Sequence, residues 1–240
     1  MRLGQLLFTQ GFGTRRECGA LVASGQVTID GLPCDDVDRE LAPEGLRFTV
    51  RGEAWTYHEH ALLVMNKPAG YECSQKPKHH PSVYSLLPAP LRGRGVQAIG
   101  RLDEDTTGVL LFSDDGSLIH RLTSPRHHVA KVYEVGCKHP VDTRQIELLT
   151  AGVVLHDDNE TVAAAACEAT GPATLRLTLT EGKYHQVKRM IAAAGNRVET
   201  LHRSGFGPVR AAGLAPGEWR WLSEAESSAV SRKRLAALEP

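Results

Sequence analysis

The chain has 240 residues with 28 basic and 28 acidic side chains, so it carries no net charge at pH 7 when its histidines are neutral. Because no apolar run reaches membrane-spanning length and the first residues contain no secretory apolar segment, we expect a cytoplasmic protein that does not contact a membrane. Its 5 cysteines form no C-x-x-C pair and its 11 histidines no H-x-x-x-H pair, a pattern that predicts reduced thiols and no metal site.

The N-terminal part predicts a small module of two helices followed by strands. Thr14 and Glu17 have the spacing of a capping box, which predicts the start of the second helix. Alternating apolar residues then predict strands over residues 27–29 and 46–50. The chain is therefore expected to divide into two domains, residues 1–57 and residues 58–240.

The rest of the chain alternates strands and helices without a strict strand–helix–strand order. Apolar runs predict strands over residues 61–66, 96–99, 107–113, 129–137, 174–180, 197–203 and 219–222. Helical spacing predicts helices over residues 116–123, 141–150, 184–194 and 223–240. This pattern indicates the α+β fold class.

The charges are unevenly distributed although their sum is zero. Residues 67–101 contain six Lys or Arg against one acid, and residues 181–210 contain six against two. Acids dominate residues 30–57, seven against three, and residues 134–168, seven against two. A neutral protein with segregated charge can present a basic face to a phosphate backbone, so nucleic acid remains a candidate partner.

The segment from Gly100 to Gly108 places Asp103 in a glycine-flanked turn between two apolar strands. Such a turn can hold a carboxylate rigidly, as nucleophilic or acid–base chemistry requires. Arg101 lies two residues away, which on an extended strand puts both side chains on one face. We expect an ion pair that keeps the carboxylate ionised, which suits a nucleophile. The alternative is a polar turn braced by a structural ion pair.

Two further segments carry candidate residues. Lys131 and Tyr133 share one face of a predicted strand, where a tyrosine can stack on a base or belong to the core. Lys188 lies one turn after Tyr184 on a predicted helix, where a cationic face can meet a carboxylate or phosphate, or can simply be solvated.

The motifs occur in an order that resembles the pseudouridine synthases of the ribosomal small-subunit (RsuA) type. The resemblance covers nearly the whole chain, beginning with a module similar to the S4 RNA-binding domain. Its motifs are N-K-P-x-G at 66–70, G-R-L-D-x-x-T-x-G at 100–108, S-P-R-H-H-x-x-K-x-Y at 124–133, E-G-x-Y-H-Q-V-K-R-M at 181–190 and L-H-R at 201–203. It implies an S4-like module followed by a catalytic domain with a mixed, largely antiparallel sheet flanked by helices.

The resemblance also implies an activity and its residues. The expected reaction is isomerisation of a uridine to pseudouridine in small-subunit ribosomal RNA, with the base flipped out of the RNA stack and no cofactor. The implied catalytic residues are Asp103 as nucleophile or base, Tyr133 as the base-stacking tyrosine and Lys188 as the partner of the aspartate. The implied substrate-binding residues are Arg101, Leu201, Thr107 and Lys131. The basic residues expected to contact RNA are Arg2, Arg15, Arg16, Lys67, Lys76, Arg126 and Arg189.

Two sequence features bear on RNA binding by the first module and on the choice of RNA. Gly4 and Gln5 stand where the family usually carries an acid–lysine pair, and residues 1–57 sum to a charge of minus two, which weakens the prediction of RNA binding by this module. His185 and Lys188 favour the small-subunit type, because large-subunit relatives usually carry arginines there. The alternatives are a large-subunit ribosomal RNA synthase and a non-catalytic RNA-binding assembly factor. We expect a monomer.

Overall fold

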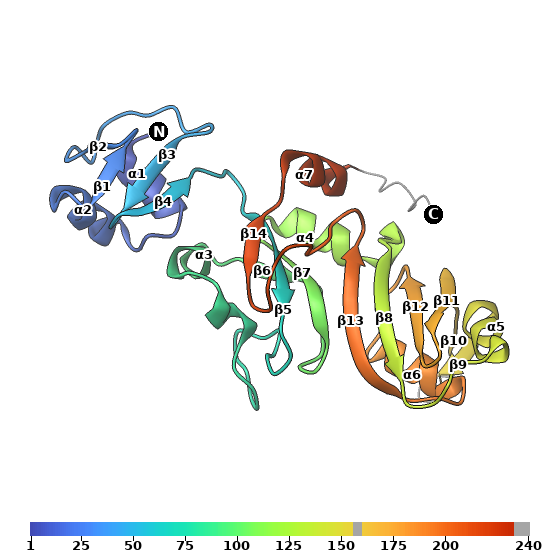
Figure 1. Cartoon of the computed structure of the whole chain (residues 1–240). Coiled ribbons are helices and arrows are strands. Elements are labelled where there is room, and N and C mark those ends of the chain that lie inside the picture. The colour runs from blue at the N-terminus through green and yellow to red at the C-terminus, as the bar shows by residue number, and fades with distance from the viewer. Residues whose placement is uncertain (156–159, 233–240) are drawn as a thin grey trace. The chain divides into compact units, whose positions relative to one another are not determined.

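The computed structural model describes residues 1–155 and 160–232. The chain forms two compact units (Figure 1). The first contains Met1–Ala61, Leu87–Gln97 and Ser113–Asp115, and the second contains Leu62–Leu86, Ala98–Phe112 and the residues from Gly116 onward. The first unit therefore includes the predicted N-terminal module together with two segments from later in the chain.

The first unit packs helices against a small antiparallel sheet. Its helices are α1 (Leu3–Thr9), α2 (Arg15–Ala23) and α3 (Ala89–Gly93), and its strands are β1 (Val27–Ile29), β2 (Leu32–Pro33), β3 (Arg47–Val50) and β4 (Glu53–Thr56), in the order β2-β1-β3-β4. Thr14 and Glu17 form the predicted capping box at the start of α2. Leucines at helical spacing in α1 are fully buried in the core, which explains why this short helix is held in place.

The second unit is built on a large mixed sheet, which confirms the predicted fold class. The strands run in the order β11-β12-β8-β13-β7-β5-β14, with β6 beside β7. They are β5 (Leu62–Lys67), β6 (Gln97–Ile99), β7 (Thr107–Ser113), β8 (Lys131–Cys137), β11 (Ala166–Gly171), β12 (Thr174–Leu179), β13 (Val198–Phe206) and β14 (Trp219–Trp221). Strand β13 pairs parallel with β7, whereas β8 pairs antiparallel with both β12 and β13.

Helices flank this sheet. They are α4 (Gly116–Thr123), α5 (Thr143–Ala151), α6 (Gln186–Ala193) and α7 (Glu224–Ser231), with the short 3-10 turns η1 (Val83–Leu86) and η2 (Pro125–His127). A separate small sheet pairs β9 (Val153–Leu155) with β10 (Glu160–Val162). Apolar side chains of α4 and α7 form one core with β5, β6 and β7. The predicted helix over residues 223–240 is observed in its first part, and residues 233–240 lie outside the described chain.

The parallel pairing of β13 with β7 requires a glycine. Gly108 is the register partner of Arg203 and has a φ of +104°, and a Cβ there would lie 2.2 Å from the backbone oxygen of Arg203. Any other residue would force the two strands apart. The second glycine of the turn around Asp103 therefore allows β7 and β13 to lie side by side, which fixes the loop before β7 against the side chains of β13.

Candidate active site

A buried lysine shapes the loop that carries Asp103. Lys67, at the end of β5, is fully buried, and its Nζ donates to the carbonyl oxygens of Pro68, Asp103, Glu104 and Thr106 at 2.9–3.2 Å. Burial lowers the pKa of this ammonium. The loop is folded around one cation, so the backbone of Asp103 has a fixed position. Lys67 was expected to contact RNA, and its burial gives it this different role.

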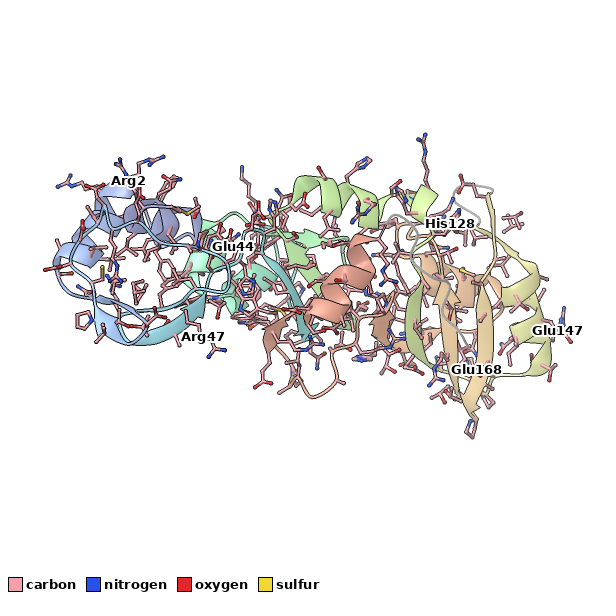
Figure 2. The ribbon with its side chains drawn as sticks, turned by 90° about the horizontal axis from the view of Figure 1, so that it is seen from above. Arg2, Glu44, Arg47, His128, Glu147 and Glu168 are labelled. Carbon is pink, nitrogen blue, oxygen red and sulfur yellow. The ribbon has the colours of Figure 1, made fainter. Side chains whose placement is uncertain are left out.

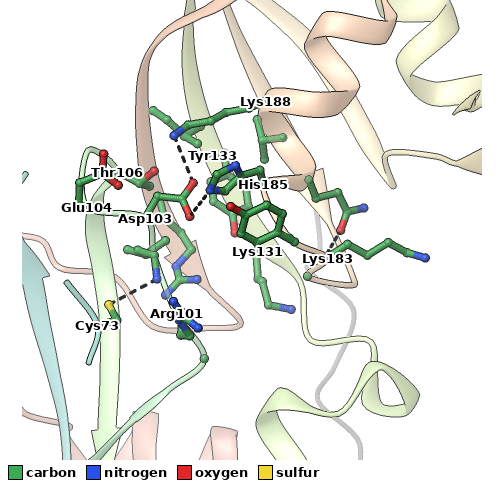
Figure 3. A pocket seen from close by; sticks show the side chains of 18 of the residues that line it. Cys73, Arg101, Asp103, Glu104, Thr106, Lys131, Tyr133, Lys183, His185 and Lys188 are labelled. Carbon is green, nitrogen blue, oxygen red and sulfur yellow. Dashed lines mark hydrogen bonds and ion pairs between the residues drawn. The ribbon is translucent and has the colours of Figure 1, made fainter. Parts of the chain in front are cut away.

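Asp103 faces two basic side chains from the segment around the start of α6. Its carboxylate oxygens lie 3.2 Å from Lys188 Nζ and 3.4 Å from His185 Nε2 (Figure 3). The pairing with Lys188 agrees with the role implied by the resemblance. Within the described chain, Arg101 makes no ion pair with Asp103, in contrast to the expected pair. Residues 101–106 form an irregular loop, so the alternation of an extended strand does not apply.

Lys188 is shared between two carboxylates. Its Nζ lies 2.7 and 2.9 Å from the two oxygens of Asp105, which is closer than its contact with Asp103. Burial tends to lower the pKa of Lys188, but hydrogen bonds and charge interactions with the two aspartates outweigh it and raise the pKa. Burial tends to raise the pKa of Asp105, and Lys188 reverses this and lowers it. Lys188 is therefore protonated at neutral pH.

The turn before α6 is strained at the site. His185 is the N-cap of α6 and adopts a left-handed conformation with φ 47° and ψ 33°. Tyr184 was expected inside the helix, but it precedes the cap, is 76% exposed and stacks on the His185 ring at 3.8 Å. A left-handed histidine costs free energy, of order 1–3 kcal/mol. Such strain is concentrated at functional sites, and here it turns the imidazole toward Asp103.

The neighbouring strands β8 and β13 supply the floor of a cavity of about 840 Å³ that includes Asp103. Tyr133 and Lys131 lie on the same face of β8, and both line the cavity (Figure 3). Leu201 and Arg203 on β13 also line it, and Arg203 is the register partner of Tyr133. Tyr133 and Leu201 are each 8% exposed. The cavity therefore combines a carboxylate, an aromatic ring, an aliphatic wall and cations.

Of the other predicted residues of the second unit, some line this cavity and others do not. Arg101 is exposed and lines it, whereas Thr107 does not, since its Oγ1 bonds His202 Nδ1 at 2.9 Å. Lys76 and Arg126 are exposed outside the lining. Arg189 donates to the carbonyl oxygen of Tyr184.

The three arginines of the first unit that were expected to contact RNA are exposed, and two of them have partners. Arg2 pairs with Asp38 at 3.3 Å, and Arg15 bonds Gln5 Oε1 and lies over the Phe8 ring. Arg16 has no ion-pair partner among the described residues. In the second unit, two acids of the acid-rich stretch, Glu147 on α5 and Glu168 on β11, are exposed at the other end of the sheet from β5 (Figure 2).

Arg203 was not singled out as a site residue, although the L-H-R motif contained it. Its side chain is 2% exposed and reaches the cavity, and its Nε donates to the carbonyl oxygen of Val109 at 2.7 Å. Its place in the L-H-R motif, two residues after Leu201, is the sequence feature that could have revealed it.

The described residues contain no group of three or more His, Cys, Asp or Glu side chains that could hold a metal ion. Over residues 1–155 and 160–232, no helix has both the length and the apolar character needed to cross a membrane.

Known proteins resemble this chain over most of its length. Residues 61–193 match the family described as RNA pseudouridylate synthase. The chain is 43% identical over 231 residues to an uncharacterized RNA pseudouridine synthase of Bacillus subtilis (strain 168), covering 94% of this chain and 96% of that protein. It is 40% identical over 231 residues to ribosomal small subunit pseudouridine synthase A of Escherichia coli (strain K12), covering 96% and 100%. A crystal structure of a pseudouridylate synthase aligns with a TM-score of 0.68 at 33% identity, covering 96% and 99%.

Proposed function

Because the chain belongs to the RNA pseudouridylate synthase family, we propose that it converts one uridine of small-subunit ribosomal RNA into pseudouridine. The family makes the chain an isomerase. The observation that carries the proposal is Asp103 held by the Lys67-centred loop, paired with Lys188, in a cavity that also contains Tyr133. Two observations support the choice of small-subunit RNA. One is the similarity to a small-subunit synthase over the full length of that relative, and the other is the presence of His185 and Lys188 in the motif at 181–190.

In the proposed reaction, Asp103 acts on the ribose of the target uridine. The N1–C1′ bond breaks and its electron pair stays on N1 of the uracil. The carboxylate either bonds to C1′ or assists removal of the C2′ proton to form a glycal. The uracil then rotates and C5 bonds to C1′, as the carboxylate leaves C1′ or, in the glycal route, the proton returns to C2′. The C5 proton is lost and N1 takes up a proton. Substrate and product are isomers, so no co-reactant is consumed. One carboxylate suffices, and Lys188 pairs with it.

Asp103 lies in a cavity whose floor is formed by residues of β8 and β13. A base that remains stacked in RNA cannot enter such a cavity, so the target base must leave the stack to reach Asp103. We propose that Tyr133 stacks on the flipped base and that Leu201 packs against its edge. Arg101, exposed at the rim, helps to hold the nucleotide. Lys131 binds the base on the same face of β8. Thr107 is left out of this proposal, because it bonds His202 and does not line the cavity.

Affinity for the RNA is proposed to come from phosphate contacts. The cations for these contacts are the exposed Lys76 and Arg126, together with Arg189, in the second unit, and Arg2, Arg15 and Arg16 in the S4-like first unit. Since Arg2 is already paired with Asp38, the contribution of the first unit rests mainly on Arg15 and Arg16. Ribosomal RNA as substrate implies a cytoplasmic location. The monomeric state stays a prediction.

Pseudouridine mapping of ribosomal RNA tests the proposal. Naked RNA and partly assembled subunits are treated with wild-type protein, with Asp103→Asn and with the control Glu147→Gln, an exposed acid on α5 outside the cavity. We expect one new site in small-subunit RNA with wild type and control, and none with Asp103→Asn. A site in large-subunit RNA would keep the proposed reaction but show that its substrate is large-subunit RNA. Absence of any site would favour a non-catalytic assembly factor.

Binding measurements separate chemistry from affinity. Asp103→Asn should keep RNA affinity within roughly tenfold, because phosphate contacts dominate it. If affinity fell as far as activity, Asp103 would be a binding residue. The double variant Arg15→Glu with Arg16→Glu should weaken binding and reduce the slope of log affinity against log salt. An unchanged slope would mean that the first unit does not touch RNA.

A further inference from the structure

The floor of the cavity contains a guanidinium that is only partly satisfied. Arg203 is 2% exposed, and its Nε–H has a partner in the carbonyl oxygen of Val109. Its Nη2 is buried and has no hydrogen-bond partner among the described residues. No carboxylate forms an ion pair with Arg203 in the described part of the chain. An unpaired buried donor on a cation is costly, and in a cavity wall it indicates a place that a ligand completes.

A second cation lies on the same floor. Lys131 Nζ donates to the carbonyl oxygen of Val129 at 3.1 Å and lies 5.5 Å from the centre of the Phe206 ring, while the Arg203 guanidinium lies 5.4 Å from that centre. Burial, and next the charge of Arg203, lower the pKa of Lys131 to about 8, while Glu181 acts weakly in the opposite direction. Two cations thus share one apolar region without an ion-pair partner of their own.

The carboxylates of the loop pair with other basic side chains. Asp103 and Asp105 are paired with Lys188 and His185, at the start of α6. Arg203 is instead the register partner of Tyr133 on the sheet. If Tyr133 carries the flipped base, as the proposed function requires, the floor cations lie beside the base. The sugar, by contrast, must lie at Asp103.

The negative group that fits this position is the uracil itself. A phosphodiester belongs to the continuous RNA strand, which stays at the mouth of the cavity, whereas the floor is closed and flanked by Tyr133, Leu201 and Phe206. Uracil is neutral in uridine, but it becomes an anion when the N1–C1′ electron pair remains on N1, and the charge spreads onto its O2 and O4 atoms. Those carbonyl oxygens are suitable acceptors for N–H donors of guanidinium and ammonium groups.

Resting on the proposed function, we propose that Arg203, with Lys131, binds the uracil anion after it leaves C1′ and stabilises the negative charge that develops on it. The cations are not consumed. They hold the anion while it turns, and the negative charge disappears when C5 bonds to C1′. The C5 proton then leaves and N1 takes up a proton. Their effect is electrostatic stabilisation by preorganised donors, which acts on the transition state and little on the neutral uridine.

A leaving-group comparison tests this role. A short target RNA is prepared with uridine or with 5-fluorouridine at the modified position, and breakage of the glycosidic bond is followed under single-turnover conditions. Fluorine stabilises the uracil anion intrinsically, so the reaction then depends less on the protein cations. The variants are Lys131→Gln and Arg203→Gln. The control is Arg176→Gln, which removes an exposed arginine that pairs with Glu134 and Glu168 outside the cavity.

With uridine, we expect each cavity variant to slow bond breakage by about 10²-fold, the usual loss for one preorganised donor. With 5-fluorouridine the loss should be at least several-fold smaller, RNA affinity should stay within about threefold, and the control should match wild type. Equal losses on both substrates, or an affinity loss as large as the rate loss, would overturn the proposal. No reaction by wild type with either RNA would instead refute the proposed function.

Arg203→Gln also removes the bond to Val109, so its fold is checked by circular dichroism and thermal melting. If it does not fold, Lys131→Gln decides the question, because the Lys131 ammonium bonds only a carbonyl oxygen two residues away. The Lys131→Arg variant keeps a cation in this place and should recover most of the uridine rate. Failure of arginine to restore any rate above that of Lys131→Gln would contradict a role based on charge.

Discussion

Replacing Lys67 with methionine should destabilise the protein and the loop that carries Asp103. The substitution keeps the volume of the side chain but removes the ammonium that the carbonyl oxygens of four residues share. Two of these oxygens keep another donor, since Thr106 N bonds Asp103 O and Gly70 N bonds Glu104 O. For the carbonyl oxygens of Pro68 and Thr106, no other donor outside the strand pairings is found among the described residues.

The size of the effect follows from these two oxygens. An unsatisfied buried polar group costs about 1–3 kcal/mol, so two of them cost roughly 2–6 kcal/mol. Burying an ammonium also costs several kcal/mol, and Lys67→Met relieves that part. We therefore expect a net loss at the low end of this range, about 2 kcal/mol. For a chain of this size, with a urea slope of about 3 kcal/mol per molar, the unfolding midpoint should fall by about 0.7 M.

Urea unfolding and single-turnover kinetics measure the two consequences. The matched control is Lys138→Met, which removes an exposed lysine at the end of β8 and should change the free energy of unfolding by less than about 0.5 kcal/mol. We expect Lys67→Met to lose rate as well as stability, while RNA affinity is largely retained. A midpoint shift below about 0.2 M together with wild-type rate would refute the view that this ammonium holds the loop.

Three further outcomes are expected. The pKa of Lys131 is about 8, and only its protonated form can stabilise an anion, so activity should fall as pH rises through 8. In a pH–rate profile, Lys131→Arg should remove this alkaline loss. Gly108→Ala places a Cβ 2.2 Å from a backbone oxygen of β13 and should lower the free energy of unfolding by several kcal/mol, measured by heat or urea. The control Gly116→Ala, with no atom within 4 Å of its Cβ, should leave the free energy of unfolding nearly unchanged. Asp105→Asn should lower the rate less than about fivefold, because an exposed ion pair with Lys188 contributes only about 0.2–1 kcal/mol, and a hundredfold loss would assign Asp105 a direct role.

The elements of the fold were largely predictable because their apolar patterns are local. The strand over residues 107–113 and the helix over residues 116–123 have the predicted bounds. The helix predicted to start at Tyr184 starts at Gln186 instead, since His185 takes a left-handed conformation that no periodic pattern encodes.

The pairings of charged residues were less predictable. Asp103 and Lys188 were associated through the order of motifs, but the closer partner of Lys188 is Asp105, 83 residues away in sequence. Arg101 was paired with Asp103 by assuming an extended backbone, and the loop geometry separates them. Lys67 follows an apolar strand directly, and its sequence context does not distinguish a surface cation from one enclosed by carbonyl oxygens. In each case the partner depends on which loops the sheet brings together.

The division of charge across the cavity fits the requirement of the proposed reaction. A glycosidase needs a second carboxyl group to protonate a leaving oxygen and to activate water. Here the leaving uracil must return as the nucleophile, so a proton donated to it would quench the electron pair that forms the new bond. Fixed cations stabilise the anion without giving up a proton readily, above all the guanidinium of Arg203. In the proposed reaction, Asp103 acts on the sugar and Arg203 with Lys131 acts on the base, which accounts for an isomerisation that uses one carboxylate.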